Sequence, residues 1–229
     1  MSEAIDLVVI GAGGHGREVA DVARACALAG QPIRVLGYVD DDASLAGQTL
    51  CDLPVLGPLR WLANHARPGL AVVSGVGSPA LRRRLVQRVA AWGVPFHRLV
   101  HPDAVLTPFI TLGEGVVITA GCILTNEIEL GDHVHLNRRA TVGHDVRIGP
   151  FGLLAPGATL SGAVRLGEGC DVGTHACVLQ NLEVGEWSII GAGAVVHRPL
   201  PSNVTAVGVP ARVIATREAG WHEGPPSQR

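Results

Sequence analysis

The sequence contains no lysine, so its 18 basic residues are all arginine. Schiff-base chemistry on a lysine and a P-loop lysine are therefore excluded. Aromatic residues make up only 3% of the chain, and the formal net charge is −2. A nucleic-acid surface requires a basic stripe with stacking aromatic rings, so we expect no nucleic-acid partner.

Paired cysteines, a signal sequence and long apolar runs are also missing. The five cysteines form no CxxC pair, which predicts small buried thiols in a reducing compartment. The first apolar strand follows acidic residues and no basic segment, unlike a signal peptide. Because no apolar run approaches the about 18 residues of a membrane helix, we expect a cytoplasmic protein with no membrane insertion.

The dominant pattern is an aliphatic residue at every sixth position, often followed directly by glycine. The row consists of Val100, Leu106, Leu112, Ile118, Leu124, Leu130, Leu136, Val142, Ile148, Leu154, Leu160, Leu166, Val172, Val178, Val184, Ile190 and Val196. A period of six fits neither the 3.6 residues of a helical turn nor a heptad, and it is the hexapeptide signature of a parallel β-helix. We predict such a domain over residues 100–214, with the aliphatic row filling its core.

The repeat ends at Pro199 and Pro201, because proline cannot donate to a strand ladder. Beyond Thr216 the sequence has no period. We therefore predict a loose tail over residues 215–229.

The N-terminal part begins with a predicted strand at residues 4–10, a glycine turn and a helix. Gly11, Gly13 and Gly16 match G-x-G-x-x-G in this context, where helix N-terminal amides can receive a phosphate. A second predicted strand, Ile33–Val39, ends in three consecutive aspartates. Dinucleotide-binding folds often keep their ribose-binding carboxylate at this place.

Only half of a doubly wound sheet fits before the repeats begin. The remaining elements are a predicted strand at Leu70–Val76, a helix at Pro79–Trp92 and a short strand at Phe96–Val100. We therefore predict a Rossmann-like βαβαβ domain over residues 1–99 that holds a single nucleotide and no NAD. The alternative is a tight glycine turn that binds nothing.

Three consecutive arginines, Arg82, Arg83 and Arg84, lie in the second predicted helix. We interpret them as its solvated face, with contact to a nucleotide phosphate as the alternative.

A small domain that opens with Gly-Ala-Gly-Gly-His-Gly and leads directly into hexapeptide repeats resembles the NeuD/PglD-type bacterial sugar acyltransferases. The resemblance runs from about Asp6 to Ile214 and includes the Gly-Val-Pro-Ala-Arg segment at residues 208–212. It implies a left-handed β-helix with three hexapeptides per coil, a homotrimer and no metal.

The resemblance also implies the reaction. It points to an acetyl-CoA-dependent N-acetyltransferase that acts on the amino group of a nucleotide-linked amino sugar, such as a 4-amino-4,6-dideoxy sugar, in bacterial glycan biosynthesis. The alternatives are a sialic-acid-type sugar O-acetyltransferase and a catalytically weak relative that binds nucleotide sugars. The family positions for the sugar nucleotide are Gly11, Gly13, Gly14, His15, Gly16, Asp40, Asp41, Gly75, Gly77 and Ser78.

His144 and Asp145 stand out among the repeats. His144 lies two residues after the inward Val142, so its side chain should lie outside a coil. A histidine can remove the proton of an attacking amine at neutral pH, and a neighbouring carboxylate can fix its tautomer. The pair also matches the family's catalytic histidine and the acidic residue that follows it.

The resemblance assigns the acyl donor to the later coils. Gly162, eighteen residues after His144, falls at a position whose backbone amide faces the thioester carbonyl, where it can stabilise an oxyanion. The implied coenzyme A contacts are Gly162, Thr174, Gly191, Ala192, Pro210, Ala211 and Arg212.

One position departs from the family pattern. Some members carry a second histidine nine residues after the catalytic one, and here that position is Leu153. His135, one coil earlier, is an alternative for the same edge. We interpret His133, His135, His175 and His197 as surface residues, and a zinc site of the γ-carbonic-anhydrase kind as the weaker alternative, since fold analogy alone does not carry function.

Overall fold

The structure is a computed structural model that describes residues 4–224. The chain divides into two compact units. The first comprises residues 4–77 and 81–102, and the second comprises residues 78–80 and 103–224. The predicted order of an α/β domain followed by a β-helix is confirmed.

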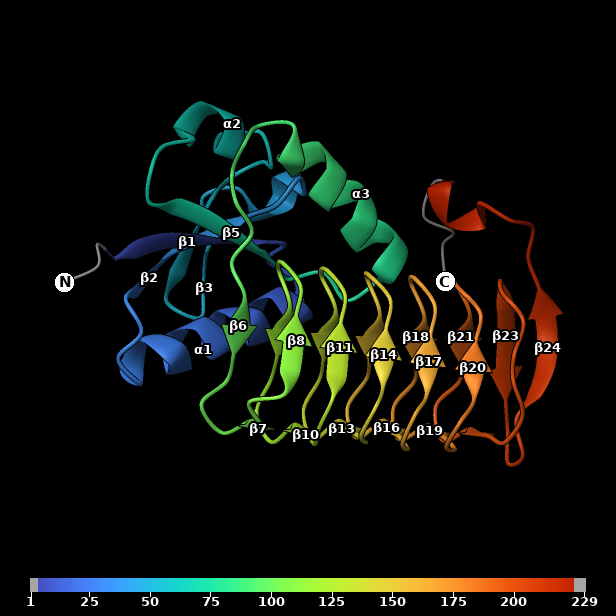
Figure 1. Cartoon of the computed structure of the whole chain (residues 1–229). Coiled ribbons are helices and arrows are strands. Elements are labelled where there is room, and N and C mark those ends of the chain that lie inside the picture. The colour runs from blue at the N-terminus through green and yellow to red at the C-terminus, as the bar shows by residue number, and fades with distance from the viewer. Residues whose placement is uncertain (1–3, 225–229) are drawn as a thin grey trace. The chain divides into compact units, whose positions relative to one another are not determined.

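The first unit is built on a five-stranded sheet with the order β3-β4-β2-β1-β5 (Figure 1). Its elements are β1 (Ile5–Ile10), α1 (Gly14–Leu28), β2 (Ile33–Val39), η1 (Ala43–Leu45), β3 (Thr49–Leu50), β4 (Leu53–Gly57), α2 (Trp61–His65), β5 (Leu70–Ser74), α3 (Pro79–Ala90) and β6 (Leu99–Val100). Strand β1 pairs in parallel with both β2 and β5. The carboxyl ends of these three strands therefore meet at one edge, which is where such sheets bind ligands.

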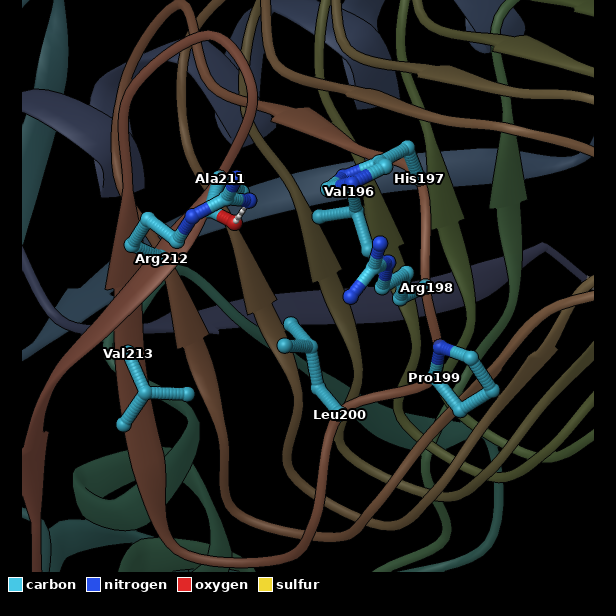
Figure 2. A pocket seen from close by; sticks show the side chains of 8 residues that line it. All are labelled: Val196, His197, Arg198, Pro199, Leu200, Ala211, Arg212 and Val213. Atoms are coloured by element: carbon cyan, nitrogen blue, oxygen red, sulfur yellow. Dashed lines mark hydrogen bonds between the residues drawn. The ribbon is translucent and has the colours of Figure 1, made fainter.

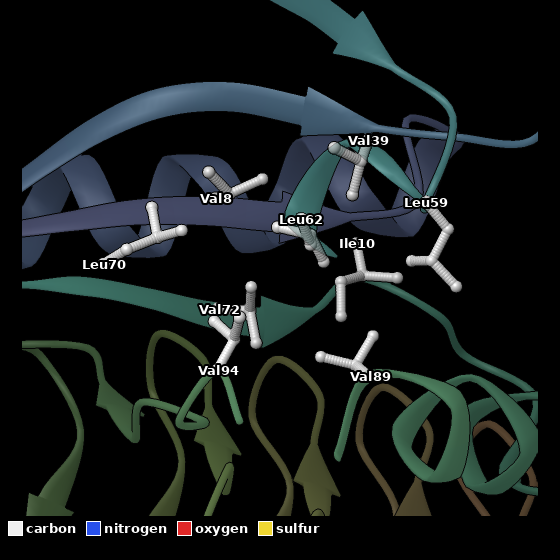
Figure 3. Packing of buried hydrophobic residues seen from close by; sticks show 9 residues of the cluster. All are labelled: Val8, Ile10, Val39, Leu59, Leu62, Leu70, Val72, Val89 and Val94. Atoms are coloured by element: carbon white, nitrogen blue, oxygen red, sulfur yellow. The ribbon is translucent and has the colours of Figure 1, made fainter. Parts of the chain in front are cut away.

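Alternation along β1 explains how the sheet is covered on both faces. Val8 and Ile10 belong to a cluster that includes Leu62 of α2 and Val89 of α3 (Figure 3). The intervening residues of β1 are also fully buried and face the other side of the sheet. A strand buried on both faces reads as a continuous apolar run, as the sequence Leu-Val-Val-Ile does.

Two features of the first unit differ from the sequence prediction. The segment between β2 and β5 contains β3, β4 and α2, which the sequence did not reveal, and β4 extends the sheet beside β2. The interpretation of Arg82 as a solvated residue was wrong, because its side chain is fully buried. Arg83 and Arg84 are half-buried.

The second unit is a left-handed parallel β-helix whose strands form three faces. The first face contains β7 (Val105–Leu106), β10 (Ile123–Leu124), β13 (Thr141–Val142), β16 (Thr159–Leu160), β19 (Cys177–Val178) and β22 (Val195–Val196). The second contains β8 (Ile110–Leu112), β11 (Ile128–Leu130), β14 (Arg147–Ile148), β17 (Arg165–Leu166) and β20 (Glu183–Val184). The third contains β9 (Val117–Ile118), β12 (His135–Leu136), β15 (Leu153–Leu154), β18 (Asp171–Val172), β21 (Ile189–Ile190), β23 (Val204–Val207) and β24 (Arg212–Thr216).

Each short strand pairs with the strand eighteen residues away, so equivalent residues stack in columns. Leu124 pairs with Val142, and Val142 pairs with Leu160. These inward residues are at most 2% exposed. Because each coil buries its apolar face only against neighbouring coils, the aliphatic column is the main source of stability.

The C-terminal segment closes the β-helix. Strand β24 runs antiparallel to β23, and η2 (Trp221–Glu223) follows. The His222 ring stacks on the Trp187 ring at a centroid distance of 3.6 Å. The predicted loose tail is therefore folded against the coil up to residue 224, and residues 225–229 lie outside the described part of the chain.

Candidate functional site

His144 lies in the turn that follows β13 and leads from the first face to the second. Its Nδ1 is 2.7 Å from Oδ2 of Asp145. Asp145 has a φ of 60°, a left-handed conformation that aspartate tolerates better than most residues. The turn itself thus places the carboxylate beside the ring, as the sequence predicts.

Backbone hydrogen bonds to the two adjacent coils hold this turn in place. The Asp145 amide donates to the carbonyl oxygen of Asn126 at 3.0 Å, and the His144 carbonyl accepts from the Ala163 amide at 2.7 Å. The position of the imidazole therefore depends on the register of three successive coils.

Gly162 lies under the His144 ring. A Cβ atom added at Gly162 would be 2.6 Å from both Cε1 and Nε2 of His144, well inside van der Waals contact. No acceptor within residues 4–224 takes a hydrogen bond from the Gly162 amide. The amide is thus available near the ring, which fits the role of an oxyanion donor.

Both catalytic candidates are open to solvent in the single chain. The side chains of His144 and Asp145 are 68% and 60% exposed. The pair therefore lies at an open edge of the prism in the single chain.

The glycines of the first unit fall into two groups. Gly11, Gly16 and Gly75 are required for packing, because a Cβ at Gly16 would lie 1.9 Å from the Gly11 carbonyl oxygen and one at Gly75 would lie 2.5 Å from the Gly16 Cα. A Cβ at Gly13 or Gly14 would meet nothing within 4 Å. Packing within the chain does not explain these two glycines, and their bare backbone leaves room for a ligand.

The two aspartates at the end of β2 already have partners. Asp40 Oδ2 accepts from the Ala12 amide at 2.8 Å, and its Oδ1 accepts from the Asp42 amide at 2.9 Å. Asp41 accepts from the Leu59 amide and pairs with Arg88 at 3.0 Å. Asp40 therefore shapes the glycine turn, and it occupies one amide that a dinucleotide phosphate would otherwise use.

The loop after β5 lies beside the glycine turn. The Gly75 amide donates to the Ile10 carbonyl at 2.8 Å. A Cβ at Gly77 would lie 3.9 Å from the His15 ring, so the imidazole faces this glycine. The structure thus brings together the predicted residues of the glycine turn, Asp40 and residues 75–77, whereas Ser78 belongs to the second unit.

Of the predicted coenzyme A residues, Gly162 lies beside His144, whereas Thr174, Gly191 and Ala192 lie at a different edge of the prism. Thr174, Gly191 and Ala192 are in turns that follow third-face strands and lead into the first face. His144 and Gly162 are in turns that leave the first face. One chain therefore carries the two groups at opposite borders of the same face.

Pro210 and Ala211 precede β24, and Arg212 is the first residue of that strand. The Ala211 amide donates to the Val195 carbonyl at 2.8 Å. Ala211 and Arg212 line a groove of about 260 Å³ together with Val196, His197, Arg198, Pro199, Leu200 and Val213. Figure 2 shows Arg198 and Arg212 on opposite sides of this groove.

Arg198 also lines this groove and was not predicted, because the proline-rich segment around it has no repeat. The sequence signal that could have found Arg198 is its place two residues after β22, the strand whose Val195 carbonyl accepts a hydrogen bond from the Ala211 amide.

The remaining histidine predictions can now be placed. Leu153 pairs with His135 in the third face, and the two side chains are 8% and 1% exposed. The surface interpretation of His133 and His135 was wrong, since both are buried. Among the described residues, no group of three or more His, Cys, Asp or Glu side chains could hold a metal ion, and no helix is long and apolar enough to cross a membrane.

Comparisons with known proteins agree with this fold. Residues 6–89 match the family described as the PglD N-terminal domain. Perosamine N-acetyltransferase from Caulobacter crescentus, solved with CoA and GDP-perosamine, is 34% identical, with a TM-score of 0.83 over 94% of this chain and 100% of that chain. The acetyltransferase domain of PglB from Neisseria gonorrhoeae FA1090, solved with acetyl coenzyme A, is 36% identical, with a TM-score of 0.84 over 92% of this chain and 100% of that one.

The curated relatives are more distant. Serine acetyltransferase from Escherichia coli (strain K12) is 30% identical over 160 residues, which are 67% of this chain and 46% of that protein. The chain thus spans about half the length of the curated relatives it matches.

The first prediction concerns Gly162→Ala. The new methyl group would displace the His144 ring, but the ring is exposed and can rotate away, so we expect only a small change in melting temperature. A crystal structure of the variant should show the His144 ring turned from its position over residue 162. The neighbouring change Ser161→Ala is the control and should leave the ring in place. An unmoved ring in Gly162→Ala would show that the close contact does not define its position.

Proposed function

This chain belongs to the NeuD/PglD-type sugar acyltransferases, and from that premise we propose that it transfers the acetyl group of acetyl-CoA to the amino group of a nucleotide-linked amino sugar. The observation that carries the proposal is the His144 imidazole, bonded to Asp145 on one side and lying over the Gly162 backbone on the other. The relative that binds CoA and GDP-perosamine supports this donor and this class of acceptor.

The mechanism follows from the two ring nitrogens. With Nδ1–H donating to Asp145, Nε2 carries the lone pair and acts as the base. The acceptor amine attacks the thioester carbonyl while Nε2 takes the amine proton. The Gly162 amide donates to the developing oxyanion. The C–S bond then breaks, and the imidazolium proton passes to the departing sulfur, which leaves as coenzyme A.

The first unit anchors the acceptor through its nucleotide. The open backbone at Gly13 and Gly14, the His15 ring and the loop at residues 75–77 form the surface that receives it. A bound nucleotide supplies binding energy remote from the reacting amine, which lowers the entropic cost of positioning that amine.

The first face of the prism fits a homotrimer. Its outward side chains carry no charge: Val105, Ile123, Thr141, Thr159, Cys177 and Val195. By contrast, the second face carries Glu129, Arg147, Arg165 and Glu183. Packing three uncharged faces about a closed axis would cover this surface. It would also place the His144 edge of one subunit beside the donor-binding edge of its neighbour.

We predict that Ile123→Asp dissociates the trimer, because it would bury a charge without a partner. Light scattering on the eluting protein should give three subunits for the wild type and fewer for Ile123→Asp. Thr111→Asp adds the same charge on the second face and should stay trimeric. A monomeric wild type, or an Ile123→Asp variant that remains trimeric, contradicts this assembly.

The direct test of the function is thiol release from acetyl-CoA. The purified protein is offered UDP-, dTDP- and GDP-linked 4-amino sugars alongside free sialic acid, and the product is analysed by mass spectrometry. Acetylation of one amino sugar nucleotide on nitrogen is the expected result. Acetylation of sialic acid on oxygen would favour the O-acetyltransferase alternative, and nucleotide binding without any turnover would favour a catalytically weak relative.

His144→Ala tests the base. General-base assistance contributes about 10²–10⁴ in rate, so kcat should fall by about that factor. The affinity for the sugar nucleotide should stay within about twofold, because His144 lies outside the glycine-turn unit. Calorimetric titration checks the binding. An equal loss in kcat and in affinity would contradict the assignment of His144 as base.

Substitutions of Arg198 and Arg212 test whether the groove that they line binds the acyl donor. Each guanidinium can make charge-assisted hydrogen bonds to the phosphates of coenzyme A. Either change to alanine should raise KM for acetyl-CoA by about tenfold and leave KM for acetyl-pantetheine, which lacks all the phosphates and the adenosine, nearly unchanged. Arg165→Ala, on the second face, is the matched control. If acetyl-CoA and the truncated donor were affected equally, the groove would not be the phosphate site.

A further inference from the structure

Arg82 is the largest fully buried side chain of the described structure. Its relative exposure is 0%. One guanidinium nitrogen, Nη1, donates to the carbonyl oxygen of Val76 at 2.8 Å and to that of Gly77 at 2.9 Å. A buried cation therefore holds two successive carbonyls of the loop that follows β5.

The burial of this cation is costly unless its donors are satisfied. Removing an ionised group from water carries a large desolvation penalty, and hydrogen bonds to a charged donor are stronger than neutral ones. A core position on α3 shared with Val86 and Val89, four and seven residues later, would ordinarily favour an aliphatic side chain. An arginine at this position is explained if its function is to hold the conformation of the loop at Val76 and Gly77.

Residues 75–77 of this loop contact the candidate nucleotide surface directly. The Gly77 backbone faces the His15 ring, with 3.9 Å between an added Cβ and the ring. Gly75 packs on the Gly16 backbone, where an added Cβ would lie 2.5 Å from Cα. A change in the path of residues 75–77 would therefore move the surface formed by His15 and the glycine turn.

We propose that Arg82 is a positioning residue for nucleotide binding, which fixes the carbonyls of Val76 and Gly77 so that the loop and His15 present a preformed surface. This inference rests on the proposed function of the first unit. Arg82 acts from behind the loop through its carbonyls and does not touch the ligand. Both bonds come from Nη1, which the rigid planar guanidinium holds in a fixed direction, whereas lysine would carry its ammonium group on a flexible stem.

The test compares Arg82→Lys with Arg83→Lys in the full-length protein. Titration calorimetry with UDP, dTDP and GDP as probes identifies the nucleotide that the wild type binds. Arg82→Lys should weaken that binding by about tenfold and raise KM for the sugar nucleotide similarly. The value of kcat at saturation and KM for acetyl-CoA should stay near those of the wild type. Arg83→Lys should match the wild type throughout.

Hydrogen–deuterium exchange gives a readout that does not depend on the function. Peptides covering residues 74–79 should exchange faster in Arg82→Lys than in Arg83→Lys. Nucleotide affinity of Arg82→Lys within twofold of the control, or a loss confined to kcat, would overturn the proposal. If the wild type binds none of the three nucleotides, the proposed function of the first unit fails. Unchanged exchange of residues 74–79 in Arg82→Lys would show in addition that Arg82 does not fix this loop.

Discussion

The eighteen-residue register of the parallel β-helix is the constraint on which the catalytic edge depends. Neighbouring coils exchange backbone hydrogen bonds in both directions, so a residue is held by the coil before it and by the coil after it. His144 receives the Ala163 amide, and Asp145 donates to Asn126. The proposed base has a 68% exposed side chain and few packing contacts to hold it, so the ladder beneath it supplies the precision that the proposed reaction requires.

The same register explains a steric rule at the corners. A ring at a turn lies over the residue one coil away, and that residue is glycine in three cases. The pairs are His144 with Gly162, His175 with Gly157, and Trp187 with Gly169, where an added Cβ would lie between 2.2 and 2.6 Å from the ring. Gly162 thus has two compatible roles, since the absence of a side chain admits the ring and the amide remains available.

The β-helix and the position of His144 on it could be predicted because the repeat is long and strict. A seventeen-fold aliphatic row determines the coil, and the coil determines which face His144 occupies. The elements that were missed are short: β3 has two residues and α2 has five, too few for a period to show. Arg82 was missed for another reason. Three adjacent arginines suggest a solvated face, but consecutive helix residues point about 100° apart, and Arg82 shares the spacing of Val86 and Val89.

The roles of Asp40 and Arg82 could not be predicted because they depend on tertiary contacts. Asp40 reaches across 28 positions to the Ala12 amide, and Arg82 turns back to the loop that precedes its own helix. Both hold backbone groups around the nucleotide surface. Charged side chains that bond to the backbone therefore help to shape the first unit, whereas repeated strands shape the second.

The most direct test of the central claim is a crystal structure of the assembled protein with coenzyme A and the amino sugar nucleotide it accepts. We expect the acceptor nitrogen within about 2.6–3.2 Å of His144 Nε2, or bridged to it by one water, and the coenzyme A sulfur beside the Gly162 amide. An acceptor nitrogen that faces another residue, with His144 turned away, would contradict it.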